Sequence, residues 1–119
     1  MADNTAIAYA GSLELQKVYR NDAEVLAAMA GSASDPSETL RLTGKAKAVK
    51  AAEKIVGDAL RNFTTDNELF KEVIDNLLKE DREARYRTYG MTEEDTELLG
   101  YLDGIQLSVE KALRERRYI

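Results

Sequence analysis

The fold class is decided by residues 42–63, LTGKAKAVKAAEKIVGDALRNF. Apolar side chains recur in this stretch at every third or fourth position, which is the spacing of one face of an α-helix. Charged side chains, chiefly lysines, occupy the opposite face. The stretch therefore predicts a long amphipathic helix whose inward face comprises Leu42, Ala46, Val49, Ala52, Val56, Leu60 and Phe63.

A loop precedes this helix. Residues 31–37 read GSASDPS, and Gly, Ser, Asp and Pro are residue types that favour turns. Asp35 is suited to cap the following helix, and Pro36 is suited to its first turn, where no amide donor is needed. We therefore expect a helix from Pro36 to about Phe63, which spans about 39 Å at the helical rise per residue.

An earlier helix is expected from a cap within residues 3–5 to Met29. Asp22 falls where an apolar residue would continue its inward face, and Asn21 is followed by a glutamate three positions later, as at a new N-cap. We therefore allow a kink or a restart near Asn21. A short strand over residues 12–19 is an alternative, but the sequence offers it no partner strand. The inward face is expected to comprise Ile7, Leu15, Val18, Val25, Leu26 and Met29.

Two further helices follow in the second half of the chain. Thr65 and Glu68 match a capping box, in which each side chain bonds the main-chain amide of the other, and Gly90 is expected to end that helix. Residues 92–95, TEED, place acidic side chains at the start of a last helix, where the helix dipole favours them. The inward faces are expected to comprise Phe70, Val73, Ile74, Leu77, Leu78 and Ala84, and then Leu98, Leu102, Ile105, Val109 and Leu113.

The whole chain is expected to form one all-α domain over residues 1–119. Ala, Glu, Lys, Leu and Arg make up about half of it, a composition typical of long helices. Short connections make consecutive long helices antiparallel neighbours. The expected fold is an antiparallel up-down bundle of four long helices, or of five if the first is broken. Alanine-rich inward faces leave a thin core, which favours pairing with a protein partner or a second copy of the chain.

Cysteine, histidine and tryptophan are absent from the sequence. Without thiol or imidazole there is no Cys-His or Ser-His nucleophile pair, no tetrahedral zinc site and no disulfide. The net charge of −5 disfavours non-specific binding to nucleic acid. No segment has the roughly 20 apolar residues of a membrane span, and the N-terminus lacks the pattern of a secretory signal. We therefore expect a cytoplasmic protein without cofactor, bound metal or membrane contact.

The best candidate for a binding surface is the end of the third helix. Tyr86 and Tyr89 lie there among Arg82 and Arg85. Tyr and Arg are enriched where protein surfaces bind each other. Stacking of the arginines on the tyrosines is an alternative that needs no partner.

A second candidate is the pair Gly100 and Gly104 within the last helix. Each glycine costs a helix about 1 kcal/mol relative to alanine. Close approach of another helix would offset that cost, and Tyr101 would flank the contact. Gly44 and Gly57 of the preceding long helix could face this pair across the bundle. Local flexibility or a kink is the alternative.

Basic side chains form one face of the helix over residues 36–63. The face comprises Lys47, Lys50, Lys54 and Arg61. Such a row could follow a phosphate backbone or an acidic partner helix, but it lacks interleaved aromatic residues to stack on bases. The solvated face of an amphipathic helix is the simpler interpretation.

Carboxylates suggest one enzymatic hypothesis. Glu72 and Asp75 share a turn of the third helix, and Glu94 and Glu97 share the first turn of the last helix. Each pair could offer oxygen ligands to Mg²⁺ and so act on a phosphorylated substrate. Helix capping and solvation are the simpler roles for these side chains.

The preferred hypothesis is a non-catalytic helical protein–protein interaction module, such as an assembly component, an adaptor, a chaperone or an inhibitor. A Mg²⁺-dependent phosphohydrolase is the alternative, and weak nucleic-acid binding through the lysine face is the second alternative. The contact residues are expected to be Arg82, Arg85, Tyr86, Tyr89, Gly100, Tyr101 and Gly104.

Overall fold

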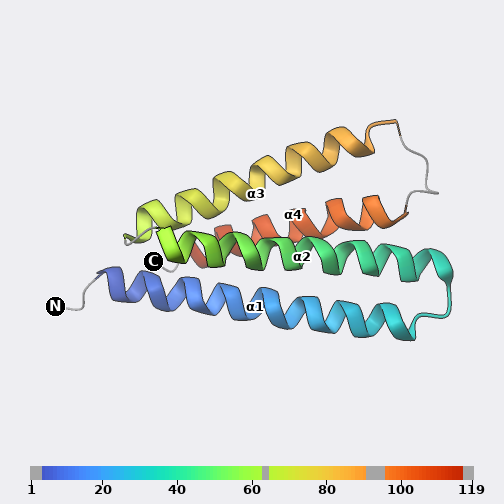
Figure 1. Cartoon of the computed structure of the whole chain (residues 1–119), viewed down its shortest axis with the longest axis horizontal. Helices are drawn as coiled ribbons and strands as arrows, with labels where there is room; N and C mark the ends of the chain where they lie inside the picture. The colour runs from blue at the N-terminus through green and yellow to red at the C-terminus, as the bar shows by residue number, and fades with distance from the viewer. Residues whose placement is uncertain (1–3, 63–64, 91–95, 117–119) are drawn as a thin grey trace.

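The computed structural model describes residues 4–62, 65–90 and 96–116, and all of its regular elements are α-helices. Consecutive helices run in opposite directions along a molecule whose longest dimension is 53 Å (Figure 1). The predicted all-α, up-down bundle of four long helices is therefore confirmed. The elements are α1 (Asn4–Ser32), α2 (Pro36–Asn62), α3 (Asp66–Thr88) and α4 (Thr96–Arg116).

Two of the predicted helix boundaries are confirmed. The Asp35 carboxylate accepts a hydrogen bond from the Ser37 amide at 3.0 Å, and Pro36 is the first residue of α2. Gly90 follows the end of α3 with a positive φ of 75°, a conformation that glycine adopts without steric cost.

The prediction of a capping box at the start of α3 is wrong. The helix does begin directly after Thr65, but the Thr65 side chain makes no capping hydrogen bond. Its main-chain carbonyl instead accepts the first helical bond, from the Leu69 amide at 3.0 Å. Because Thr65 is exposed, water can satisfy the free amides of the first turn.

The predicted kink or restart near Asn21 is also wrong, because α1 is one continuous helix. Asp22 lies on the half-buried side of α1 and forms an ion pair with Lys111 of α4, each side chain being 25% exposed. The carboxylate therefore occupies the inward face with a partner, and the helix has no need to break there. The strand considered for residues 12–19 is helical.

The apolar core fills the half of the bundle near the α2–α3 connection. It is built mainly from α1, the second half of α2 and the first half of α3, as the following buried residues show: Leu15, Tyr19, Ala23, Val49, Ala52, Val56, Ala59, Leu69, Phe70, Val73, Ile74 and Leu77, with Ala112 of α4. Tyr19 and Ala23 were missed by the sequence pattern. Four residues predicted to face inward are 39–50% exposed, namely Val25, Met29, Leu78 and Leu113.

Toward the α1–α2 connection, α2 and α4 approach closely through glycine. A Cβ atom at Gly100 would overlap the carbonyl oxygen of Arg41, and one at Gly44 would overlap that of Glu97. At Gly104 it would lie 2.6 Å from the carbonyl oxygen of Lys45. The predicted helix–helix contact of Gly44 with the glycine pair is thus present within the chain. Gly57 is not part of it, since its nearest neighbour is Gln16 of α1.

The helix α3 is held less firmly than the others. It packs mainly on α4, and toward its C-terminal end it diverges from α1 and α2 (Figure 1). Beyond Leu77, the one side chain of α3 that is buried in the described part of the helix is Ala84. The last three turns of α3 therefore project from the bundle on a narrow support. None of the four helices, over the residues that the structure describes, has the length and hydropathy of a membrane span.

Candidate protein-interaction surface

The projecting end of α3 carries two almost fully exposed aromatic side chains. Tyr86, on the last turn, is 85% exposed, and Tyr89, directly after the helix, is 91% exposed. The other tyrosines whose side chains are described, Tyr19 and Tyr101, are buried and half-buried. Tyr86 and Tyr89 thus present large apolar rings to solvent without contributing to the core.

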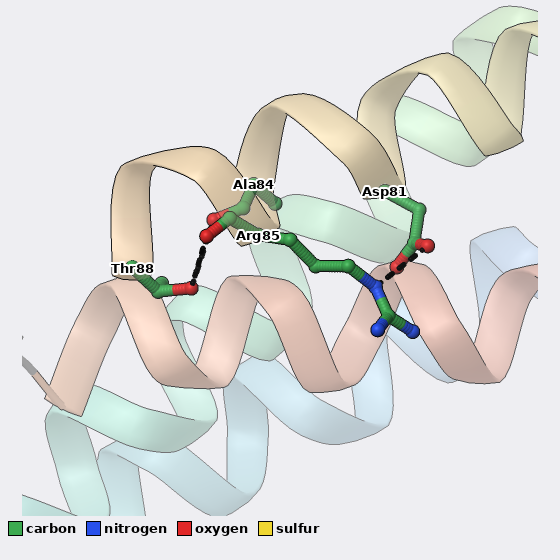
Figure 2. A network of polar contacts seen from close by, with 4 residues as sticks. All are labelled: Asp81, Ala84, Arg85 and Thr88. Carbon is green, nitrogen blue, oxygen red and sulfur yellow. Dashed lines mark hydrogen bonds and ion pairs between the residues drawn. The ribbon is translucent and has the colours of Figure 1, made fainter. Parts of the chain in front are cut away.

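The backbone beneath these rings is regular and well bonded. The hydroxyl of Thr88 donates to the carbonyl oxygens of Ala84 and Arg85, at 3.0 and 3.1 Å (Figure 2). The Tyr89 amide donates to the Tyr86 carbonyl at 3.3 Å. The final turn of α3 is therefore closed by local hydrogen bonds close to both tyrosines.

Two arginines complete this cluster. Arg82 is exposed and precedes Tyr86 by one helical turn, so the two side chains share a face. Arg85 lies on the neighbouring flank, where its Nε donates to Asp81 at 2.9 Å on the side of α3 that faces α4 (Figure 2). We refer to Arg82, Arg85, Tyr86 and Tyr89 as the α3 surface.

The remaining predicted contact residues lie elsewhere. Gly100 and Gly104 are buried against α2, and they cannot reach the α3 surface. Tyr101 is half-buried between α3 and α4, where its hydroxyl donates to a carboxylate oxygen of Glu80 at 3.2 Å. Burial, reinforced by the negative charge of Glu80, raises the pKa of Tyr101 to about 12. These three residues hold the bundle together.

The basic face of α2 is exposed, but two of its members have acidic partners. Lys47 forms an ion pair with Glu97 of α4, and Arg61 forms one with Asp58 one turn earlier. Lys50 and Lys54 are exposed. The continuous row of free cations suggested by the sequence is thus reduced to its two central lysines.

The carboxylates of the enzymatic hypothesis are not brought together. Glu72 accepts a hydrogen bond from Asn76 at 3.0 Å and lies on the side of α3 that borders α2. Glu97 lies near the opposite end of the bundle, where α4 begins, and Glu94 falls outside the described residues. Among the residues that the structure describes, no three acidic side chains cluster as a cation site would require.

A groove of 540 Å³ between α1 and α2 was not anticipated. Alanines of both helices contribute to its lining, and the ion pair of Arg20 with Glu53, at 2.7 Å, borders it. The spacing of Ala23, Ala27 and Ala30 along α1 was the available sequence signal. Small side chains at helical spacing are equally typical of close packing inside a bundle, so the pattern alone does not identify a groove.

The geometry defines an all-α four-helix bundle with one projecting, aromatic helix end. No known protein family, curated protein or solved structure matches the chain. What the protein does is therefore argued from its own residues.

Proposed function

We propose that this protein is a non-catalytic, cytoplasmic protein–protein interaction module that binds its partner through the α3 surface. The observation that supports the proposal is the exposure of Tyr86 and Tyr89, at 85% and 91%. Rings of this size gain free energy when another surface covers them, because each tyrosine buries on the order of 150–250 Å². Tyr and Arg, together with Trp, are enriched among the few residues that contribute most of the binding energy of protein interfaces.

The support beneath the surface also favours binding. Ala84 is buried at 3% exposure on the α4 side, and the Thr88 hydroxyl closes the last turn. A partner that covers Tyr86 and Tyr89 therefore finds the backbone already ordered. Beyond the translational and rotational freedom that any association loses, ordering of this surface then costs mainly the rotamer freedom of a few side chains, about 0.5–1.5 kcal/mol for each one immobilised.

The test compares three forms of the full chain. The first is the wild type, the second carries Tyr86→Ala with Tyr89→Ala, and the third is a control with Lys50→Ala and Lys54→Ala on α2. Because all four side chains are exposed, the far-UV circular dichroism and the melting temperature are expected to stay unchanged.

Quantitative affinity purification from the native cells is combined with light scattering of the purified protein. We expect a specific partner, or a second copy, to associate with the wild type and the α2 control, and recovery by the tyrosine variant to fall about tenfold or more. The proposal is contradicted if the wild type is monomeric and recovers the same proteins, in the same amounts, as the tyrosine variant does.

A further inference from the structure

Charged side chains are sorted by sign along residues 79–87. The sequence of this segment, KEDREARYR, is almost balanced in charge. In the structure, all three acidic side chains are half-buried and all four basic side chains are exposed. The acidic set comprises Glu80, Asp81 and Glu83, and the basic set comprises Lys79, Arg82, Arg85 and Arg87.

Two of the acidic side chains accept hydrogen bonds, one from α4 and one from within α3. Glu80 accepts the hydrogen bond from the Tyr101 hydroxyl at 3.2 Å, and Asp81 accepts one from Arg85 Nε at 2.9 Å. The second carboxylate oxygen of Asp81 is buried. These two negative charges are therefore held against the bundle and do not lie on the outward side of α3.

Near its C-terminal end, the outward side of α3 is left with cations and aromatic rings. Lys79, Arg82 and Tyr86 follow one another at spacings of three and four, so they lie along one helical face. The exposed Asp75 precedes this face by one turn. Lys79 also borders the groove between α2 and α3, which is lined by two acidic side chains of α3, Glu72 and Glu80. Lys79 and Arg82 form no ion pair with any residue in the described ranges. Beyond Asp75, the exposed charges of α3 are all basic, although the chain as a whole carries a net charge of −5.

We infer that the partner presents an acidic protein segment to this face. The inference rests on the proposed function, and it adds the chemistry of the partner to it. Carboxylates of the partner would meet Lys79 and Arg82, and Arg82 can bind a carboxylate through two parallel N–H donors. Apolar atoms between those carboxylates would cover the Tyr86 and Tyr89 rings. Opposite charge would also steer the two proteins together and fix the register of the contact.

Nucleic acid is the competing ligand for arginine and tyrosine side chains, since bases stack on aromatic rings and phosphates bind cations. One feature favours protein. The exposed cations of this face lie only at the end of one helix, whereas a nucleic-acid strand needs a longer cationic path.

Fluorescence anisotropy on the full chain tests the inference with defined probes. The first probe is a labelled helical peptide of about 20 residues that carries both glutamates and leucines on one helical face. The second probe, its matched control, has every glutamate replaced by glutamine. The third probe is a labelled oligothymidine of similar length. Titrations are run at about 50 mM and about 500 mM salt, which span strong and weak screening.

We expect the glutamate peptide to bind the wild type at low salt. The Kd should be about tenfold higher in each of three comparisons: at high salt, for the glutamine peptide, and for the Arg82→Glu protein. The control Lys54→Glu, on α2, should change the Kd by less than about twofold. Both substitutions are at exposed positions and make the same change in net charge.

The contrary outcomes separate the two proposals. If both peptides bind equally and Tyr86→Ala abolishes the binding, the α3 surface is an interaction site and the acidic partner is wrong. If oligothymidine binds at lower concentration than the glutamate peptide, the ligand is nucleic acid and the acidic protein is wrong. If no probe binds the wild type, the acidic partner is again overturned, whereas the proposed function still stands or falls by the affinity purification.

Discussion

The hydroxyl of Tyr19 in α1 donates a hydrogen bond to the main-chain carbonyl of Ser108 in α4, at 2.5 Å and across 89 positions of the chain. Both residues are buried, at 0% and 1% exposure. The Ser108 hydroxyl in turn donates to the Gly104 carbonyl at 2.8 Å. These bonds connect the core at one end of the bundle with the glycine contact of α2 and α4 toward the other.

The first prediction concerns the Tyr19 hydroxyl. Tyr19→Phe keeps the ring in the core and removes one buried hydrogen bond, so the free energy of unfolding should fall by about 1–2 kcal/mol. Urea denaturation measures it. The matched control is Tyr89→Phe, which removes a hydroxyl from a 91% exposed side chain and should change stability by less than about 0.5 kcal/mol. Equal stability of the two variants would show that the buried bond contributes nothing.

The second prediction concerns alkaline pH. Burial, together with the charge of Asp22, raises the pKa of Tyr19 above its ordinary value of about 10. The unfolded chain therefore loses this proton at a lower pH than the folded protein does. Stability is complete below pH 10 and falls as the pH rises beyond it, by about 1 kcal/mol at pH 11 from Tyr19.

Urea titrations between pH 8 and about pH 11 check this sign. The Tyr19→Phe variant should lose less stability over this interval than the wild type does. It should not become independent of pH, because Tyr101, whose pKa is raised to about 12, contributes in the same direction. A variant that loses as much as the wild type would mean that Tyr19 titrates normally in the folded state.

The fold could be predicted because its determinants are local. The cap at Asp35, the proline that follows it and the glycine at position 90 act within one turn of the helix ends that they define. The rotation of α1 could not be predicted in the same way. Tyr19 and Ala23 replace Val25 and Met29 on the inward face, and that choice depends on the helices that pack on α1, chiefly α2 and, at Tyr19, also α4.

For the candidate site, too, the residue types could be predicted from the sequence, but the arrangement that depends on other helices could not. Residue type alone pointed to Arg82, Arg85, Tyr86 and Tyr89, and the structure places all four at the exposed end of α3. The sequence could not show that the acidic and basic side chains around them differ in exposure. Glu80 lies on the side of α3 that contacts α4, whereas Arg82 is exposed. Gly100 and Gly104 were predicted to make a close helix contact, with Gly44 and Gly57 as candidates on the facing helix, and the structure places Gly44 but not Gly57 at that contact.

The third prediction concerns the ion pair of Asp22 with Lys111. Both side chains are three-quarters buried, so removal of one partner leaves the other charge poorly solvated. Asp22→Asn should lower the free energy of unfolding by about 1–3 kcal/mol. Adding Lys111→Met should recover most of this loss, since the double variant buries no unpaired charge. A double variant that is less stable than Asp22→Asn would show that the lysine is stabilised by other contacts.

The fourth prediction compares two glycines within helices. Gly31→Ala should be neutral or slightly stabilising, since nothing lies within 4 Å of the added Cβ and alanine is the better helix former by about 1 kcal/mol or less. Gly100→Ala has the same intrinsic gain, yet its Cβ would overlap the Arg41 carbonyl oxygen, which belongs to rigid helix backbone. We expect it to destabilise the protein by about 1–3 kcal/mol. Thermal and urea unfolding of the two variants measure the difference, and a Gly100→Ala protein as stable as Gly31→Ala would mean that α2 and α4 do not approach each other as closely as described.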